Sequence, residues 1–164
     1  MNSLRIRAYQ PEDAPAVLDL WLACQLVVPH NNSRQDIARK LRVNPEWFLV
    51  GELGGRIVAT CMAGYEGHRG WINYLAVTPE HQRRGYARRM MEEAEQLLRQ
   101  AGCPKINLQI RATNKGVIEF YRNLGFKVDE VVSMGKRLES DLPPPGPAGG
   151  PRPKTHATRG LTRK

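Results

Sequence analysis

The 164-residue sequence predicts a single α+β domain, with a mixed, mostly antiparallel twisted sheet and flanking helices. Strand-like segments outnumber helical ones, and the tight Gly54-Gly55 turn joins two of them as a hairpin. A long amphipathic segment over residues 85–100 separates two further strands, as a parallel crossover requires. A chain of this length can bury a hydrophobic core without disulfides or metal ions.

The first half of the chain alternates between strand and helix signals. The expected elements are a strand over 4–8, a helix over 11–25, a short helix over 33–41, and strands over 47–52, 56–65 and 71–77. Ser33 and Asp36 have the spacing of a capping box, which predicts that Ser33 caps the second helix.

The second half continues with apolar residues at helical spacing and with alternating stretches. The expected elements are a helix over 85–100, a strand over 105–110, a helix that Thr113 or Asn114 caps and Gly125 ends, and two last strands over 126–129 and 131–136. Gly102, with Pro104 just beyond it, indicates where the long helix stops.

Charge is unevenly distributed along the chain. It has 25 basic and 16 acidic residues, a formal net charge of +9, which predicts an anionic partner. Residues 141–164 hold six of the twelve prolines and five basic residues against one acid, which predicts a disordered basic tail after a domain over 1–140. The tail is either a nucleic-acid or membrane-surface arm or a dispensable extension, and the lack of aromatic residues for base stacking favours the extension.

The three cysteines, Cys24, Cys61 and Cys103, are far apart and form no cluster with the spacing of zinc ligands. They predict reduced thiols in a cytoplasmic protein without a bound metal. No apolar run approaches the ~18 residues of a membrane-spanning helix. The N-terminus also lacks the apolar core of a signal peptide.

The segment from Tyr74 to Ala87 carries the strongest chemical signal. A strand ends, a short loop follows, and Gly85 opens a helix whose first N–H groups have no partners within that helix. The helix dipole and nearby arginines add positive charge, and the glycine lets a ligand approach the backbone closely. These features predict a pyrophosphate-binding site. The loop matches neither the P-loop nor the Rossmann fingerprint.

The pattern Gln82-x-x-Gly85-x-Ala87 resembles motif A of the GNAT family of acyl-CoA N-acyltransferases. Residues 111–114 and 120–126 resemble the family's Asn-x6-Tyr helix and its closing Leu-Gly-Phe turn. The resemblance covers about residues 4–138 and implies the GNAT fold.

Within the family, segments 64–70 and 133–138 are most similar to the YpeA branch, and the RimI-type protein N-terminal acetyltransferases are a second resemblance. The resemblance implies an acetyl-CoA-dependent N-acetyltransferase that passes the acetyl group directly to an amine. It also implies that the strand over 74–77 bulges and splays from the next strand, with the pantetheine arm between them. The implied coenzyme A ligands are Leu75, Ala76, Val77, Gln82, Arg83, Arg84, Gly85, Tyr86, Ala87, Asn114 and Tyr121.

The resemblance also implies catalytic roles. Tyr121 is expected near the thioester sulfur, where a phenol can protonate the leaving thiolate, although it could also be a core tyrosine. The general base is not evident, because Gln109 stands where RimI-like enzymes carry a glutamate. Glu66 and His68 are the nearest candidates by chemistry; the alternative is that they are polar turn residues far from the thioester. Without an evident carboxylate base, the chain favours an α-amine or another weakly basic acceptor.

The acceptor is expected on the other side of the sheet, near the loop that contains His30, Asn31 and Asn32 and near the last two strands. A small-molecule amine or a peptide N-terminus is the expected acceptor. Nucleic-acid and membrane partners are not expected, and a homodimer is left open. A non-catalytic acyl-CoA sensor, motivated by Gln109, is the main alternative function, and a basic nucleic-acid binder is a third.

Overall fold

The computed structural model describes residues 3–28 and 31–141. Five strands form one sheet, in which they lie side by side in sequence order. They are β1 (Arg5–Ala8), β2 (Phe48–Leu53), β3 (Arg56–Tyr65), β4 (Gly70–Val77) and β5 (Ile106–Asn107). The first four strands pair antiparallel, and β5 pairs parallel to β4.

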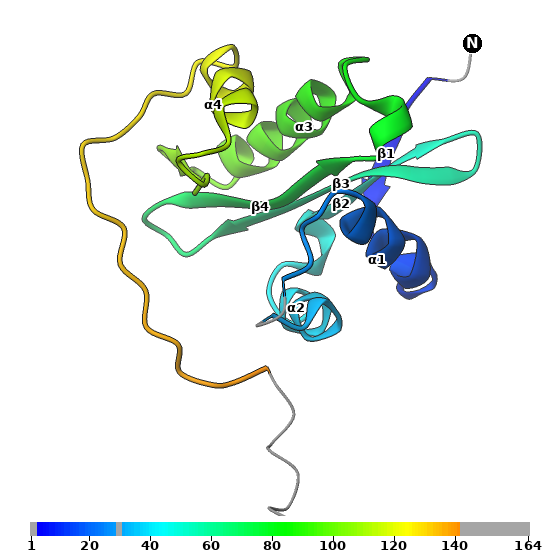
Figure 1. Cartoon of the computed structure of the whole chain (residues 1–164), viewed down its shortest axis with the longest axis horizontal. Coiled ribbons are helices and arrows are strands. Elements are labelled where there is room, and N and C mark those ends of the chain that lie inside the picture. Colours follow the sequence, from blue (N-terminus) through cyan, green and yellow to red (C-terminus); the bar gives the residue numbers. More distant parts are fainter. Residues whose placement is uncertain (1–2, 29–30, 142–164) are drawn as a thin grey trace, which may run out of the picture.

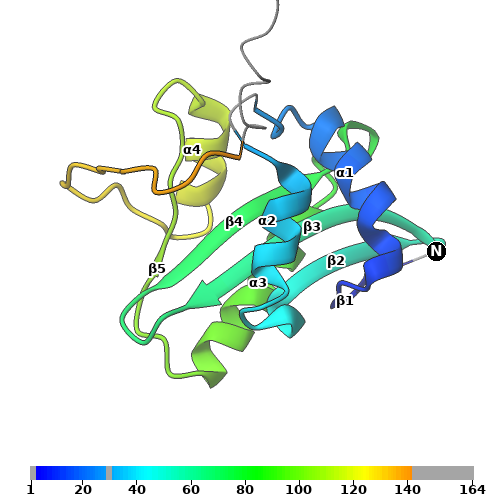
Figure 2. The same ribbon diagram turned by 90° about the horizontal axis from the view of Figure 1, so that it is seen from below.

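Helices cover both faces of this sheet (Figure 1). On one face lie α1 (Ala14–Ala23) and α2 (Ser33–Lys40), which Figure 2 shows in front of the strands. On the other lie α3 (Tyr86–Gln100) and α4 (Lys115–Arg122). Three short 3-10 helices are η1 (Pro11–Asp13), η2 (Pro45–Trp47) and η3 (Pro79–His81). The predicted fold class, a mixed and mostly antiparallel sheet with flanking helices, is confirmed.

One apolar face of α3 explains its position across the sheet. Met90, Met91 and Leu98 recur at helical spacing and are fully buried or nearly so. The strand beneath approaches closely, because a Cβ atom on Gly51 would lie 3.1 Å from the Met90 sulfur. The helix therefore carries the chain over the sheet from β4 to the parallel strand β5.

A second core lies under α1 and α2, with Trp21 at its centre. The indole is fully buried and stacks on the Tyr74 ring, with ring centroids 3.9 Å apart. It also stacks on Phe48, and its N–H donates to Thr60 Oγ1 at 2.9 Å. These contacts fix α1 to the middle of β3 and β4.

The start of α2 differs from the predicted capping box. Asn32, not Ser33, is the capping residue, because its side-chain oxygen accepts from the backbone N–H groups of Arg34 and Gln35. Ser33 becomes the first helical residue and is buried. Asp36 is therefore not used by the cap.

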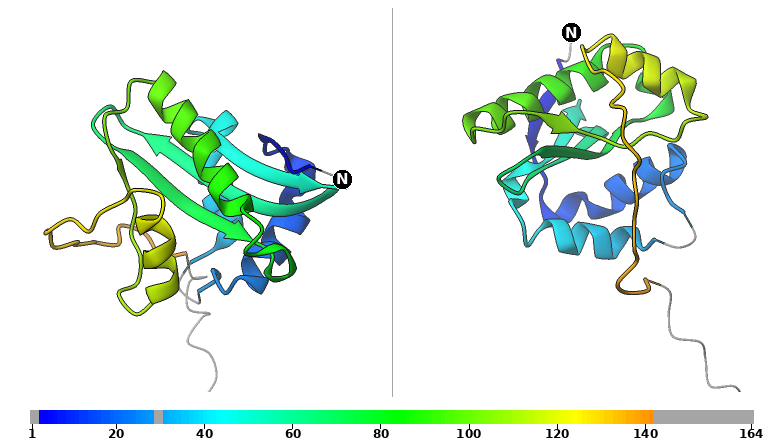
Figure 3. Two further views of the ribbon diagram at one scale, coloured as in Figure 1. Left: turned by 90° about the horizontal axis from the view of Figure 1, so that it is seen from above. Right: turned by 90° about the vertical axis from the view of Figure 1, so that its left-hand side faces the viewer.

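The prediction of two strands over 126–129 and 131–136 is wrong. Residues 126–141 run without a backbone ladder from α4, past the edge of the sheet, toward α2 (Figure 3). Val132 and Met134 are about nine-tenths exposed. An alternating valine pattern forms a strand only where a neighbouring strand pairs with it. Here β5 keeps only two residues of the strand predicted over 105–110. The predicted disordered tail lies outside the described residues, apart from Asp141.

Candidate active site

A bulge in β4 lies at the centre of the candidate site. Thr60 of β3 pairs with Ala76 and Met62 pairs with Asn73, so Tyr74 and its neighbour face a single residue of β3. Tyr74 has a φ of +50°, in the left-handed region. The Thr60 hydroxyl donates to the Tyr74 carbonyl at 2.8 Å, which holds the bulge in place.

Beyond their first residues, β4 and β5 separate. Only Gly70 and Trp71 pair with β5, so the rest of β4 has no strand on that side within the described ranges. Ala76 directs its main-chain groups toward β3, and those of Val77 therefore point to the open side. The opening has the V shape that the resemblance implied for the pantetheine arm.

The loop between β4 and α3 presents a run of free backbone donors. In the part of the chain that the structure describes, the N–H groups of Arg83 through Ala87 have no acceptor. Arg83 and Gly85 have φ values of +58° and +80°, and left-handed residues of this kind shape main-chain N–H groups into anion-binding concavities. A Cβ atom on Gly85 would meet no atom within 4 Å, so the space above the glycine is open.

The Gln82 side chain stabilises this loop. Its side-chain amide donates to the Val77 carbonyl at 3.0 Å, and the Cys24 thiol donates to the same oxygen at 3.2 Å. A carbonyl oxygen has two lone pairs, so only the N–H of Val77 remains for a ligand. The Thr78 hydroxyl and His81 Nδ1 lie 2.8 Å apart and tighten the turn further.

Positive charge surrounds the loop, but its arginines differ in role. Arg88 and Arg89 donate to the carbonyls of Asn123 and Leu4, and so tie α3 to neighbouring segments. Residues 83–84 are exposed arginines beside the free N–H groups. Their charge adds to that of the helix dipole at the same end of α3.

Two predicted residues belong to α4. Asn114 caps the helix, since its side-chain oxygen accepts from the Val117 N–H at 3.3 Å. Tyr121 is buried, and its ring meets those of Phe120 and Phe126 edge to face. Burial raises the pKa of Tyr121 above its ordinary value, so the phenol keeps its proton at neutral pH.

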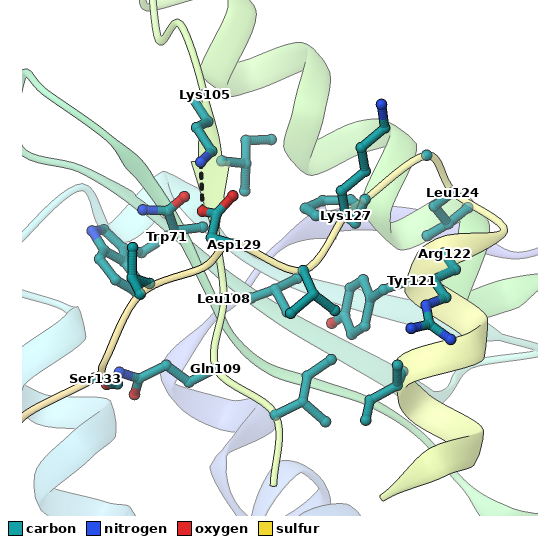
Figure 4. A pocket seen from close by; sticks show the side chains of 18 of the residues that line it. Trp71, Lys105, Leu108, Gln109, Tyr121, Arg122, Leu124, Lys127, Asp129 and Ser133 are labelled. Carbon is teal, nitrogen blue, oxygen red and sulfur yellow. Dashed lines mark hydrogen bonds and ion pairs between the residues drawn. The ribbon is translucent and has the colours of Figure 1, made fainter. Parts of the chain in front are cut away.

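A hollow of about 1540 Å³ opens beside β5 (Figure 4). Tyr121 lines it together with residues 103–112 and most of residues 124–133. Gln109, where a glutamate would suit a base, is exposed and hydrogen-bonds the Ser133 hydroxyl. The loop before α3 does not line this hollow, so the two features are distinct.

The structure does not bring Glu66 and His68 to the other candidate residues. Both are exposed in the turn that precedes β4, whereas the bulge lies in the second half of that strand. The Glu66 carboxylate accepts from the backbone N–H groups of Arg69 and His68, which lowers its pKa. A carboxylate stabilised in its charged form is a weaker proton acceptor, and its visible role is to order the turn.

The structure instead joins Tyr74 to Asp36, a contact that sequence reasoning missed. The Tyr74 hydroxyl donates to Asp36 Oδ2 at 2.7 Å, on the side of the bulge that faces α2. The two residues are 38 positions apart. The only sequence signal at Asp36 was its spacing from Ser33, which suggested a helix cap.

The loop between α1 and α2 meets the end of the described chain. Arg137 donates to the Asn31 side chain at 2.9 Å, and Asp141 accepts from the Asn32 N–H. The C-terminal region thus approaches this loop as expected, although without strands. His30, the expected titrating group of the loop, lies outside the described residues.

The model of the acetyltransferase (GNAT) family matches residues 14–126, which is more than half of the chain. The chain belongs to the GNAT family. A curated relative from Yersinia pestis (strain Pestoides F), named an acetyltransferase, is 41% identical over 138 residues, which are 84% of this chain and 98% of that protein. Its name does not distinguish the YpeA branch, so placement in that branch stays a prediction.

Two solved structures share this GNAT fold. The ribosomal-protein-S18-alanine N-acetyltransferase from Escherichia coli aligns with a TM-score of 0.64 and 22% identity, over 76% of this chain and 78% of that one. AAC(6')-Iy in complex with the bisubstrate analogue CoA-S-monomethyl-acetylneamine aligns with a TM-score of 0.67 and 17% identity, over 82% and 99%.

Among residues 3–28 and 31–141, no group of three or more His, Cys, Asp or Glu side chains is placed to hold a metal ion. No helix there is both long and apolar enough to cross a membrane. The cytoplasmic location stays a prediction.

Proposed function

We propose that this protein is an acetyl-CoA-dependent N-acetyltransferase, which passes the acetyl group directly from coenzyme A to an amine. The observation that carries the proposal is the run of N–H groups from Arg83 to Ala87, which find no acceptor in the described part of the chain, beside the open edge of β4. Phosphate oxygens are natural acceptors for such donors at a helix start. An extended pantetheine arm can hydrogen-bond an unpaired strand edge in the way that an extended peptide does. Membership of the GNAT family supports the same donor.

The pantetheine arm would bond the strand edge. Leu75 would offer its main-chain groups, as the resemblance implies, and Val77 offers its N–H. Ala76 bonds β3 through its main chain and so contributes only its methyl group. Asn114 would bond the arm from the start of α4, and Tyr121, one helix length away, would lie at the thioester.

The pyrophosphate would lie in the loop, on the N–H groups of residues 83–87. Gln82 acts indirectly, because its amide is engaged with the strand end. Tyr86 begins the helix, and its N–H belongs to the same donor run. The side chains of residues 83–84 would add positive charge beside the phosphates.

Chemistry at the bulge follows from this placement. The amine nitrogen attacks the thioester carbonyl carbon, and negative charge develops on the carbonyl oxygen, which the Leu75 N–H can stabilise. The carbon–sulfur bond then breaks, and the Tyr121 phenol donates its proton to the thiolate. A phenol is protonated at neutral pH, as a general acid must be.

Transfer is expected to be direct, without an acetylated cysteine as an intermediate, because no cysteine of the chain is expected to act as the nucleophile. Cys61 is fully buried, and burial raises its pKa to about 12. Burial also raises the pKa of Cys24, which donates to the Val77 carbonyl. Cys103 donates to the Lys105 carbonyl, at the N-terminal end of β5. Because the thiolate is the nucleophilic form, these raised pKa values make the thiols of Cys61 and Cys24 poor nucleophiles near neutral pH.

An α-amine, on a small molecule or at a peptide N-terminus, is the acceptor that we propose. An α-amino group with a pKa of ~8 is neutral in about one copy in ten at pH 7, whereas a lysine amine is neutral in only about one in a few thousand. A site without a strong carboxylate base at Gln109 favours the amine that is already partly neutral. The solved S18-alanine N-acetyltransferase shares the fold and is named for an alanine acceptor, which is consistent with this class.

The alternative is a sensor that binds acyl-CoA without turnover, which the Gln109–Ser133 contact favours because it leaves no carboxylate at that position. Purified protein with acetyl-CoA and a panel of amines separates the two functions. We expect thiol release that depends on the amine and matches the amount of acetylated amine. Calorimetric binding of acetyl-CoA without transfer to any amine would support the sensor.

A further inference from the structure

A tyrosine and a carboxylate from distant parts of the chain meet beside the β4 bulge. The Tyr74 hydroxyl donates to Asp36 Oδ2 at 2.7 Å. The Tyr74 ring is stacked on Trp21, and its main-chain carbonyl is held by Thr60, so the hydroxyl has a fixed position. Both Tyr74 and Asp36 are partly buried, and neither has a structural role in capping α2.

Ser33 lies beside this pair. It is 8% exposed, and an interaction of its hydroxyl with the Tyr74 phenol lowers the pKa of that phenol. Tyr74 therefore lies between a buried hydroxyl and the Asp36 carboxylate.

The basic side chains around the pair do not compete with Tyr74 for Asp36 Oδ2. Arg39 of α2 bonds the other oxygen, Oδ1, at 3.1 Å and also pairs with Asp141. Arg137 lies 3.9 Å from Asp141 and forms the outer side of this network. Lys40 points elsewhere, since it donates to two main-chain carbonyls.

We propose that Tyr74 and Asp36 form a proton relay for the acceptor amine, an assignment that rests on the proposed acetyltransferase function. As the nitrogen–carbon bond forms, the Tyr74 oxygen takes a proton from the nitrogen, and the phenol proton passes to Asp36 Oδ2. Asp36 is partly exposed and returns this proton to water. The thiolate takes its proton from Tyr121, which regains one from solvent, so protons balance over one turnover.

The chemistry of the phenol explains why the carboxylate is needed. Burial and the neighbouring Asp36 raise the pKa of Tyr74, so the phenolate is scarce at neutral pH. A neutral phenol oxygen accepts a proton well only if its own proton leaves at the same time. Tyr74 is therefore the catalytic residue of the relay, and Asp36 is the residue that makes its oxygen basic.

The bulge also places Tyr74 on the face of the sheet where the acceptor amine is expected. Leu75, the next residue, packs into the core on the α3 side of the sheet, while Tyr74 packs into the core under α1 and α2. The amine would then approach from the side of α2, opposite the coenzyme. This is the side on which the acceptor is expected from the sequence.

The test compares Tyr74→Phe, Asp36→Asn and the double variant with the full-length wild type, using the best amine of the panel. We expect each single variant to lower kcat/KM for the amine about 100-fold at pH 7, with acetyl-CoA affinity within about twofold of wild type. The double variant should lose little more, because the two residues act as a unit. Tyr65→Phe, which removes a hydroxyl bonded to the Gly67 carbonyl, is the matched control and should keep full activity.

The pH profile separates a relay from a structural role. The loss in Tyr74→Phe should shrink about tenfold between pH 7 and pH 9.5, because hydroxide can then take the proton of the attacking nitrogen in place of the relay. A pH-independent loss, or activity within threefold of wild type in both variants, would overturn the relay while leaving the acetyltransferase function standing. An inactive wild type that binds acetyl-CoA would overturn both.

Discussion

The Gln82 side-chain amide donates to the Val77 carbonyl at 3.0 Å and so ties the loop before α3 to the end of β4. This bond fixes the two parts of the proposed donor site relative to each other. We expect Gln82→Ala to weaken acetyl-CoA binding by up to about tenfold, since one neutral hydrogen bond contributes about 1 kcal/mol. Calorimetric titration measures this, with the exposed Gln100→Ala in α3 as control. Equal dissociation constants for the two variants would contradict the bracing role.

Gly85→Glu tests the proposed pyrophosphate site. The carboxylate would stand in the open space above the loop and repel phosphate, so we expect acetyl-CoA affinity to fall at least about 100-fold. Gly55→Glu is a closely matched control, because Gly55 has the same φ of +80° and also meets nothing within 4 Å. Both variants should lose similar stability. If acetyl-CoA binds both equally well, the anion site lies elsewhere.

Tyr121→Phe removes the proposed proton donor while keeping the buried ring and its edge-to-face contacts. We expect kcat to fall about 100-fold with little change in acetyl-CoA affinity, as for loss of a general acid. Steady-state kinetics and calorimetry on the same preparation give both numbers. Unchanged kcat would mean that water protonates the thiolate.

Asp13 gives a prediction about pH and stability. Arg7 binds both carboxylate oxygens of Asp13, at 2.7 and 2.9 Å, and this holds the pKa of Asp13 below its usual range. A lowered folded-state pKa means that the stabilisation is complete above pH ~4 and is lost as the pH falls below that. Asp13→Asn should therefore lower the free energy of unfolding by about 1–3 kcal/mol at pH 7 and by much less at pH 3.

Urea unfolding at the two pH values checks the Asp13 prediction. Glu12→Gln serves as the control, because Glu12 is the exposed neighbour of Asp13. An equal destabilisation by Asp13→Asn at pH 3 and pH 7 would show that the ion pair with Arg7 is not its source.

Local signals sufficed where one segment determines its own structure. The apolar face of α3, the hairpin at Gly54-Gly55 and the glycine that opens the helix could all be read from the sequence. The strands over 126–136 could not be judged in this way, because a strand depends on a partner. That partner, β5, is shorter than its alternating residues predicted.

The same distinction between local and long-range features applies to the candidate site. The donor loop is continuous in sequence and was predicted, including the run of N–H groups from Arg83 to Ala87. The Tyr74–Asp36 contact joins α2 to a bulge in β4, 38 positions further along the chain. No local pattern encodes such a contact. Glu66 and His68 were predicted as candidate bases by their chemistry alone. Both lie in the turn that precedes β4, away from the bulge.

The most direct test of the central claim is an assay of acetyl-CoA consumption with the amine panel, in which free thiol and acetylated amine are both quantified. The account predicts equal amounts of the two products, the fastest transfer to an α-amine near neutral pH, and no transfer by Gly85→Glu. Faster transfer to lysine ε-amines would contradict the proposed acceptor class. Thiol release without any acetylated amine, or no release at all, would contradict the proposed acetyltransferase activity.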